Sequence, residues 1–217
     1  MGAPSLSGVA SYPCLEDFGE GVVGMTSSMV RWGGLAGVAA GVMFVLSGIL
    51  TLIAPPQREL GSFGGYLIEV VIVVAFALVM AAVAGLHAAQ RHSGRYGRLG
   101  AVGALLTFVG YAIVLVAAHV TTLAGGEPIS TARLVGGLAV LVGSILLGVM
   151  TLRAGLLPWW CGVLLIVGFP LGAVLEEVVA VGSENVVFAI VWGSVGYALL
   201  LQRGRAAEQP SRVTRVS

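Results

Sequence analysis

The chain contains 217 residues, of which 58% are hydrophobic and only 10% are charged, and its mean hydropathy is +1.01. Soluble globular proteins contain about 25% charged residues, so this composition cannot supply the polar surface that a water-soluble domain of this length needs. The formal net charge is +1, and no basic run with interleaved aromatic residues indicates nucleic-acid binding. Composition therefore predicts an integral membrane protein and excludes soluble and nucleic-acid-binding classes.

The N-terminal segment, residues 1–30, is predicted to be a flexible cytoplasmic tail. Acidic residues at Glu16, Asp17 and Glu20 interrupt the region where a secretion signal needs basic and then apolar residues. Leu6 occupies the position where N-myristoylation requires Ser or Thr. We therefore expect neither signal in this tail. Three methionines are alternative translation starts: Met1, Met25 and Met29.

Six apolar runs follow, and most are long enough to cross about 30 Å of hydrocarbon at about 1.5 Å per residue. Glycine and proline clusters separate them, and the connections are short, as between neighbouring antiparallel helices. We expect an all-α polytopic bundle of six membrane-spanning helices over residues 31–203, followed by a cytoplasmic tail at 204–217. The predicted spans are Trp32–Ala54, Tyr66–Ala89, Leu99–Val120, Leu134–Leu152, Leu156–Leu175 and Val186–Leu201.

The basic residues, all of them arginines, predict the orientation of these spans. Only Arg58 and Arg133 fall on the side opposite the termini, and the other nine fall on the side that carries both termini. Because cytoplasmic loops are enriched in basic residues, we expect both termini to be cytoplasmic in a bacterial inner membrane. The nine are Arg31, Arg91, Arg95, Arg98, Arg153, Arg203, Arg205, Arg212 and Arg215.

Two glycine patterns carry predictions about packing. The segment Gly33–Ala36 reads Gly-Gly-Leu-Ala, as does Gly136–Ala139, which predicts an inverted repeat of three spans per half, as in many secondary transporters. The alternative is a chance match in spans that consist mostly of Gly, Ala, Val and Leu. In addition, Gly33, Gly37 and Gly41 share one helix face. Such a face serves either a homo-oligomer or membrane partner, or close packing within the bundle.

Polar residues inside or at the ends of the spans are the candidates for chemistry, because a charge in hydrocarbon is costly and by default marks a pathway or ligand site. Glu69 lies about one turn inside the second span, and His119 and the pair Glu176–Glu177 end the third and fifth spans at the same level. Pro170 is expected to break the fifth span before the glutamates. The candidate residues for a ligand or proton pathway are Glu69, Tyr111, His119, Arg133, Glu176 and Glu177.

Three interpretations of this cluster remain open. The carboxylates and the imidazole could bind a divalent cation or the head of an amphiphilic ligand. Protonation of Glu69 and His119 could drive a proton-coupled movement. Alternatively, these residues mark the water interface, and only Glu69 needs a partner, either Arg133 or Arg58.

Known catalytic and cofactor patterns are missing from the sequence. It contains no metalloenzyme spacing, no phosphate-binding Gly-Lys motif and no lysine for Schiff-base chemistry. His87 and His119 are predicted at opposite faces, which is poor geometry for a shared haem. Cys14 and Cys161 are interpreted as free thiols. We therefore expect no metal and no cofactor, and no catalytic residue is assigned.

Three segments carry a family resemblance: Arg31–Gly37, Gly94–Arg98 and Thr151–Trp159. With the span pattern over residues 31–203, they make the chain similar to a loose set of small, uncharacterised bacterial six-span membrane proteins. The resemblance implies the fold and an inner-membrane location, and it implies no activity.

The sequence therefore predicts a non-enzymatic, transporter-like or accessory membrane subunit whose partners are membrane lipids. The alternative is a membrane enzyme or receptor for a lipid-like ligand that uses the Glu/His cluster.

Overall fold

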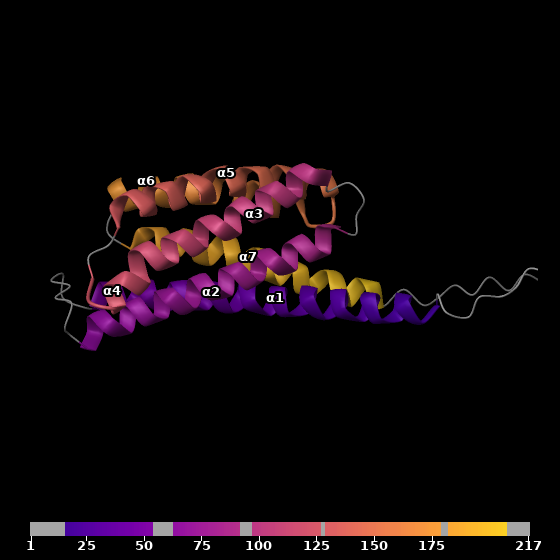
Figure 1. Ribbon diagram of the computed structural model, residues 1–217, viewed down its shortest axis with the longest axis horizontal. Coiled ribbons are helices and arrows are strands. Elements are labelled where there is room, and N and C mark those ends of the chain that lie inside the picture. The colour runs from indigo at the N-terminus through magenta and orange to yellow at the C-terminus, as the bar shows by residue number, and fades with distance from the viewer. Residues whose placement is uncertain (1–15, 54–62, 92–96, 127–128, 179–181, 208–217) are drawn as a thin grey trace, which may run out of the picture.

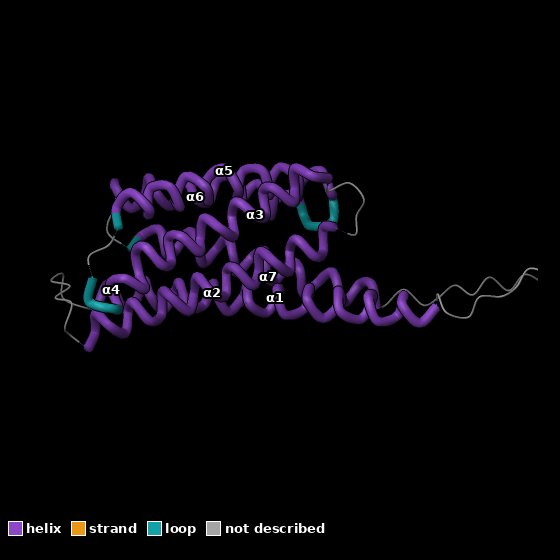
Figure 2. Tube along the Cα trace, viewed as in Figure 1, coloured by secondary structure: helices purple, strands orange, loops and turns teal. Residues whose placement is uncertain are grey.

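The computed structural model describes residues 16–53, 63–91, 97–126, 129–178 and 182–207, and these form helices joined by short turns, with no strand among them (Figure 2). The third span is a composite of α3, a six-residue π-helix (η1) and α4. The elements in chain order are α1 (Glu16–Ile53), α2 (Phe63–Arg91), α3 (Gly97–Val114), η1 (Leu115–Val120), α4 (Thr121–Leu123), α5 (Ser130–Ala154), α6 (Trp159–Val178) and α7 (Ser183–Ala207).

Among the described residues, six helical segments are long and apolar enough to cross a membrane, which confirms the predicted all-helical six-span architecture. They bury only 28–50% of their most apolar windows inside the bundle, because lipid covers the remaining apolar surface in a membrane protein. The six segments are Ser28–Ile53, Phe63–Arg91, Gly97–Leu123, Ser130–Ala154, Trp159–Glu176 and Ser183–Gln202.

The first helix begins well before the predicted span. α1 starts at Glu16, within the segment predicted to be a flexible tail, and its N-terminal part projects beyond the other helices (Figure 1). Helix formation is cooperative, so the hydrogen-bond pattern of the apolar span extends into the preceding residues. α7 likewise continues to Ala207, past the predicted boundary at residue 203.

The helices form two layers (Figure 1). One layer contains α1, α2 and α7, and the other contains α3, α5 and α6. Helices that follow one another along the chain are neighbours, and α7 closes the ring by packing on α1. Packing is most extensive between α1 and α2, between α1 and α7 and between α3 and α5. It is sparser between α5 and α6 and at the two seams between layers, where α6 meets α7 and α2 meets α3.

Glycines bring the helices of each layer into close contact. A Cβ added at Gly33 would lie 2.5 Å from the Cα of Gly85 on α2, and one at Gly37 would lie 2.8 Å from the Cα of Gly196 on α7. Gly41 similarly faces Gly193 on α7. The predicted Gly33, Gly37 and Gly41 face is therefore filled by helices of the same chain, so a second copy would have to bind a different surface.

The two Gly-Gly-Leu-Ala segments differ in the contacts of their first glycine, since Gly33 contacts Gly85 on α2 whereas Gly136 contacts Gly110 on α3. Gly37, one turn after Gly33, contacts Gly196 on α7. The first span therefore packs on the second and sixth spans, and the fourth span packs on the third and fifth. This arrangement of neighbours does not decide between the inverted repeat, which stays a prediction, and a chance match by composition.

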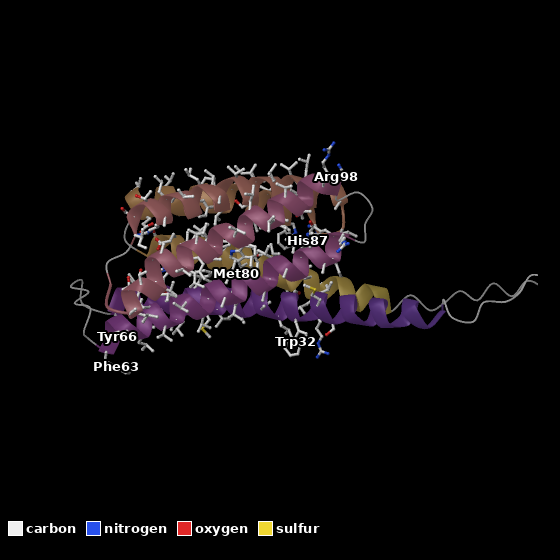
Figure 3. The ribbon with its side chains drawn as sticks, in the orientation of Figure 1. Trp32, Phe63, Tyr66, Met80, His87 and Arg98 are labelled. Atoms are coloured by element: carbon white, nitrogen blue, oxygen red, sulfur yellow. The ribbon has the colours of Figure 1, made fainter. Side chains whose placement is uncertain are left out.

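Aromatic side chains project outward near both ends of the bundle (Figure 3). Trp32 is 67% exposed at the end from which α1 projects, and Phe63 is 84% exposed at the opposite end. Arg98 lies at the same end as Trp32 (Figure 3). Aromatic residues at both levels of an apolar surface are typical of the two membrane–water interfaces.

Reporter fusions test the predicted orientation. A periplasm-active reporter fused after Arg203 or in the loop at Ser93 should be silent, because arginine-rich segments stay on the cytoplasmic side. A matched fusion at Gly125, in the turn between α4 and α5, should be active. Activity at Arg203 or Ser93 would contradict the six-span topology.

Candidate functional site

A contact between Glu69 and His119 joins the two helix layers. The Nδ1 atom of His119 on η1 lies 2.8 Å from Oε2 of Glu69 on α2, and the two side chains are 18% and 13% exposed. One proton makes this hydrogen bond: either the imidazole Nδ1–H donates to the carboxylate, or the protonated carboxyl donates to Nδ1. Glu69 therefore faces the bundle interior and meets a partner that can exchange a proton with it.

The π-helix sets the direction in which His119 points. At about 100° per residue, eight residues of regular α-helix would turn His119 about 80° away from Tyr111. The wider i→i+5 turns of η1 take up about one extra residue, which cancels most of this rotation. Tyr111 and His119 therefore line the same cavity. Single-turn π-helical segments occur frequently at functional sites, and this one carries a candidate residue.

Threonine hydroxyls stabilise the end of the π-helix. Thr121 Oγ1 donates to the carbonyl of Ala117 at 2.9 Å, and Thr122 Oγ1 donates to that of Ala118 at 2.6 Å. The amide of Ile129, beyond the following turn, also donates to Ala117 O at 3.0 Å. These bonds occupy carbonyls that a π-helix leaves poorly paired, and they hold the chain near His119 in place.

A cavity of about 370 Å³ lies between the two layers at the Glu69 end of the bundle. This volume is at the lower end of the range of about 300–1,000 Å³ that is typical of small-molecule sites. Every one of the six spans contributes to its wall. The lining residues include Phe44, Glu69, Phe76, Tyr111, His119, Thr122, Arg133, Val140, Phe169, Glu176, Glu184, Asn185 and Phe188.

The cavity wall has two levels, one polar and one aromatic or apolar. On α2, Glu69 lies two turns closer to the end of the bundle than Phe76, and on α7, Glu184 lies one turn closer than Phe188. On α5, Arg133 is likewise two turns from Val140. The polar groups therefore lie at the level nearer the end of the bundle, and the deeper wall is aromatic and apolar. We call the polar level the mouth of the cavity.

The aromatic level is a continuous chain of ring contacts across five spans. Phe44 joins Phe76 and Phe188 with centroid distances of 5.8 and 5.5 Å, and Phe169 stacks on Phe188 at 6.1 Å. Phe76 also contacts the rings of Tyr111 at 5.5 Å and His119 at 5.4 Å. Phe76 is thus the junction between the aromatic level and the Glu69–His119 pair.

The structure brings together five of the six predicted site residues. Glu69, Tyr111, His119, Arg133 and Glu176 all line this cavity. Glu177 belongs to α6, but the placement of its side chain lies outside the described part, as does Arg58.

The structure bears on two local interpretations. Arg133, one of the two arginines considered as a partner of Glu69, is exposed at the rim, and among the described residues Glu69 contacts His119 instead. An imidazole on a neighbouring helix reaches the carboxylate directly, so an arginine is not needed. Pro170 does not break the fifth span, since α6 runs continuously through it, as transmembrane helices often do where neighbours satisfy the freed carbonyl.

Sequence reasoning missed the aromatic wall and two polar groups, Glu184 and Asn185. These two residues lie in the first turn of α7, just before the predicted start of the sixth span at Val186. A signal was available, because Glu69 with Phe76 and Glu184 with Phe188 follow helical spacing of seven and four residues. This spacing identifies a common cavity wall only once the positions of the helices relative to one another are known.

A second polar contact joins the layers at the opposite end. Gln90 on α2 is fully buried, and its Nε2 donates to Thr151 Oγ1 on α5 at 2.6 Å, while Thr151 Oγ1 donates to Leu147 O at 2.7 Å. The surrounding half of the bundle is tightly packed, with Leu86, Leu147 and Leu199 all at most 1% exposed. α2 therefore carries a polar contact to the other layer near each of its ends.

Among the residues that the structure describes, no three histidine, cysteine or carboxylate side chains lie close enough together to hold a metal ion. The side chain of Glu177, a member of the predicted cluster, lies outside that description.

Neither a scan against protein-family models nor searches of the curated proteins and of the solved structures found a match for this chain.

Proposed function

We propose that this chain is a membrane carrier that binds a small amphiphilic molecule in the cavity between its two helix layers. The observation that carries the proposal is the shape of that cavity. It reaches from a polar mouth at Glu69 to Phe76 and Tyr111, which lie near the middle of their spans. A site that is accessible from one side and ends near the bilayer midplane is typical of secondary transporters.

The packing of the opposite half supports a carrier more than a channel. Fully buried Leu86, Leu147 and Leu199 fill the bundle between the cavity floor and the end that carries the termini. No continuous pore is needed when the layers can move relative to each other along their sparser seams. Rocking of two packed units around a central site is the common form of alternating access.

The two polar contacts on α2 are suited to opposite gates. Glu69–His119 and Gln90–Thr151 are separated by about six helical turns, or about 30 Å along α2. Each links α2 to the other layer, and each is a hydrogen bond that can break and re-form. In the carrier, the first contact is expected to strengthen when the mouth closes, and the second is expected to open when the packed half separates.

The membrane location belongs to the same proposal. The asymmetric arginine distribution supports a bacterial inner membrane with both termini in the cytoplasm. In this orientation the cavity faces the periplasm. The carrier in this state would therefore receive its ligand from outside the cell.

Cysteine labelling tests whether the cavity opens to alternate sides. Cys14 and Cys161 are first replaced by Ser and Ala, and single cysteines are then placed at Ala118 in the cavity or at Ala198 in the packed half, which is 2% exposed. A membrane-impermeant maleimide should label Ala118→Cys from the side of the mouth. In a carrier it should also label Ala198→Cys, more slowly, from the opposite side.

The control and the contrary outcomes separate the alternatives. Val42 is 60% exposed on the lipid-facing surface of α1, so Val42→Cys should stay unlabelled from both sides. If Ala198→Cys also stays unlabelled from both sides, the protein is a receptor or enzyme with one access route. If Ala118→Cys is unlabelled from the side of the mouth, the cavity is not a binding site that water can reach.

A further inference from the structure

We infer that the ligand of this cavity is a small organic cation, an ammonium group attached to an apolar or aromatic body. The inference rests on the proposed function and names its substrate class. Three features of the wall carry it: the balance of charge at the mouth, the aromatic faces below it, and the short distance between these two levels.

The mouth carries an excess of negative charge. Among the residues that the structure describes, three carboxyl groups line it, from Glu69, Glu176 and Glu184, together with the guanidinium of Arg133. The formal sum is negative whether His119 is neutral or protonated. Glu184 also lies in the first turn of α7, where the helix dipole favours a carboxylate. Since Arg133 is exposed at the rim, the side chains between it and the aromatic level carry no fixed positive charge.

The aromatic level provides faces that attract a cation. Phe44, Phe76 and Phe188 contact one another at 5.5–5.8 Å with interplanar angles of 52–88°, so their rings present faces in different directions. A cation within about 6 Å of such a face is attracted by the ring quadrupole, and the effect grows when water is excluded. Aromatic side chains that surround a cation are a known means of recognising quaternary ammonium groups, and these rings provide one wall of the cavity.

The distance between the two levels limits the size of the ligand. One to two helical turns separate the carboxylates from the rings on the same helix, which is about 6–10 Å along the axis. With a volume of about 370 Å³, the cavity therefore fits one charged head and one ring or short chain. An anionic ligand would bring its charge next to three carboxylates, whereas a cationic head would be attracted by them, so the wall favours a cation over an anionic or a neutral ligand.

Three probes with the same benzyl body test the charge preference. They are benzyltrimethylammonium, benzyl methyl sulfone and benzylsulfonate, which carry a positive, a neutral and a negative head on one ring. Isothermal titration calorimetry on the full chain in detergent should show the tightest binding for the cation and the weakest for the anion. We expect a difference of about tenfold or more between cation and neutral probe, because one nearby charge in a partly desolvated site has an effect of this order.

Variants of cavity residues test whether the charge preference among the probes arises in the cavity. Glu184→Gln should weaken binding of benzyltrimethylammonium about tenfold and leave the sulfone unchanged, and Glu176→Gln provides a second variant if the first does not fold. The matched control is Glu20→Gln, which makes the same charge change in the N-terminal part of α1. Phe76→Leu should also weaken the cation about tenfold, whereas Phe63→Leu, at an 84% exposed ring that points away from the bundle (Figure 3), should not.

The outcomes distinguish this inference from the proposed function. Equal binding of all three probes, or preference for the sulfonate, would overturn the cation inference while the cavity stays a binding site. If no probe binds and Ala118→Cys is also unlabelled, the proposed function itself fails. Equal effects of Glu184→Gln and Glu20→Gln would place the charge effect outside the cavity and overturn the inference.

The same ammonium chemistry occurs in free amines and in the headgroup of phosphatidylethanolamine. Titration of benzyltrimethylammonium in nanodiscs of phosphatidylglycerol, with and without phosphatidylethanolamine, separates the two sources. Displacement of the probe by phosphatidylethanolamine would identify a lipid headgroup as the ligand. Unchanged binding would identify a free cation, and both results support an ammonium site.

Discussion

Replacing Gly196 by valine should prevent the chain from folding into a stable bundle. A Cβ at this position would lie 2.5 Å from the amide nitrogen of Val38 and 2.6 Å from the carbonyl oxygen of Gly34, both in the backbone of α1. Backbone atoms cannot move aside as side chains do, so α1 and α7 would have to separate along their length. Overpacking of this kind costs about 3 kcal/mol or more.

The measurement is the monodisperse fraction after detergent extraction, followed by thermal unfolding of whatever protein is recovered. Gly64→Val is the matched control, because nothing lies within 4 Å of a Cβ added there. We expect the control to keep wild-type yield and Gly196→Val to aggregate. Equal recovery of both variants would show that α1 and α7 do not pack as described.

Glu69→Leu should destabilise the bundle by about 1–3 kcal/mol, because Nδ1 of the partly buried His119 then loses its hydrogen-bond partner. Glu69→Gln should change stability by less than about 1 kcal/mol, since its amide oxygen still accepts from Nδ1–H. Comparison of the two variants therefore separates the contribution of the hydrogen bond to stability from that of the negative charge. Glu69→Gln should in addition weaken benzyltrimethylammonium binding, because it removes one of the three carboxylates at the mouth.

A double-mutant cycle measures the contact itself. Thermal unfolding of Glu69→Leu, His119→Leu and the double variant should give a coupling energy of about 0.5–3 kcal/mol, since residues in direct contact are not additive. The double variant is expected to be more stable than the sum of the single losses predicts. Additive losses would show that the two side chains do not share a hydrogen bond in the folded protein.

The proposed gate at the mouth connects Phe76 and the Glu69–His119 pair to the carrier cycle. Phe76 contacts the ring of His119 and the ring of Tyr111, so a ligand that displaces Phe76 also changes the surroundings of the Glu69–His119 pair. A cation at the mouth also interacts with the Glu69 carboxylate, which accepts from His119. Ligand binding and closure between α2 and η1 are therefore expected to be coupled through one carboxyl group.

The sequence by itself determined the class of protein and its six helices. In the membrane, a long apolar run can satisfy its backbone hydrogen bonds only in a helix or in a closed barrel. Runs that are apolar on every side exclude the barrel, whose strands alternate between apolar and polar residues. The positions of the six spans therefore follow from the apolar runs and from the Gly and Pro residues that separate them. A buried carboxylate at Glu69 also required an inward partner on energetic grounds. The level shared by Glu69, His119 and Glu176 followed from counting residues from span ends.

Only the tertiary structure decided which residues meet around that carboxylate. The partner of Glu69 is His119 rather than Arg133 because a π-helical turn, which no propensity of Leu115–Val120 signals, rotates the imidazole toward α2. The aromatic wall is likewise a property of assembly: Phe44, Phe76 and Phe188 lie on three helices and become one surface only through the glycine contacts that set helix separation. Lipid-facing and cavity-facing phenylalanines have the same hydrophobicity, so their direction depends on helix rotation, which packing between helices fixes.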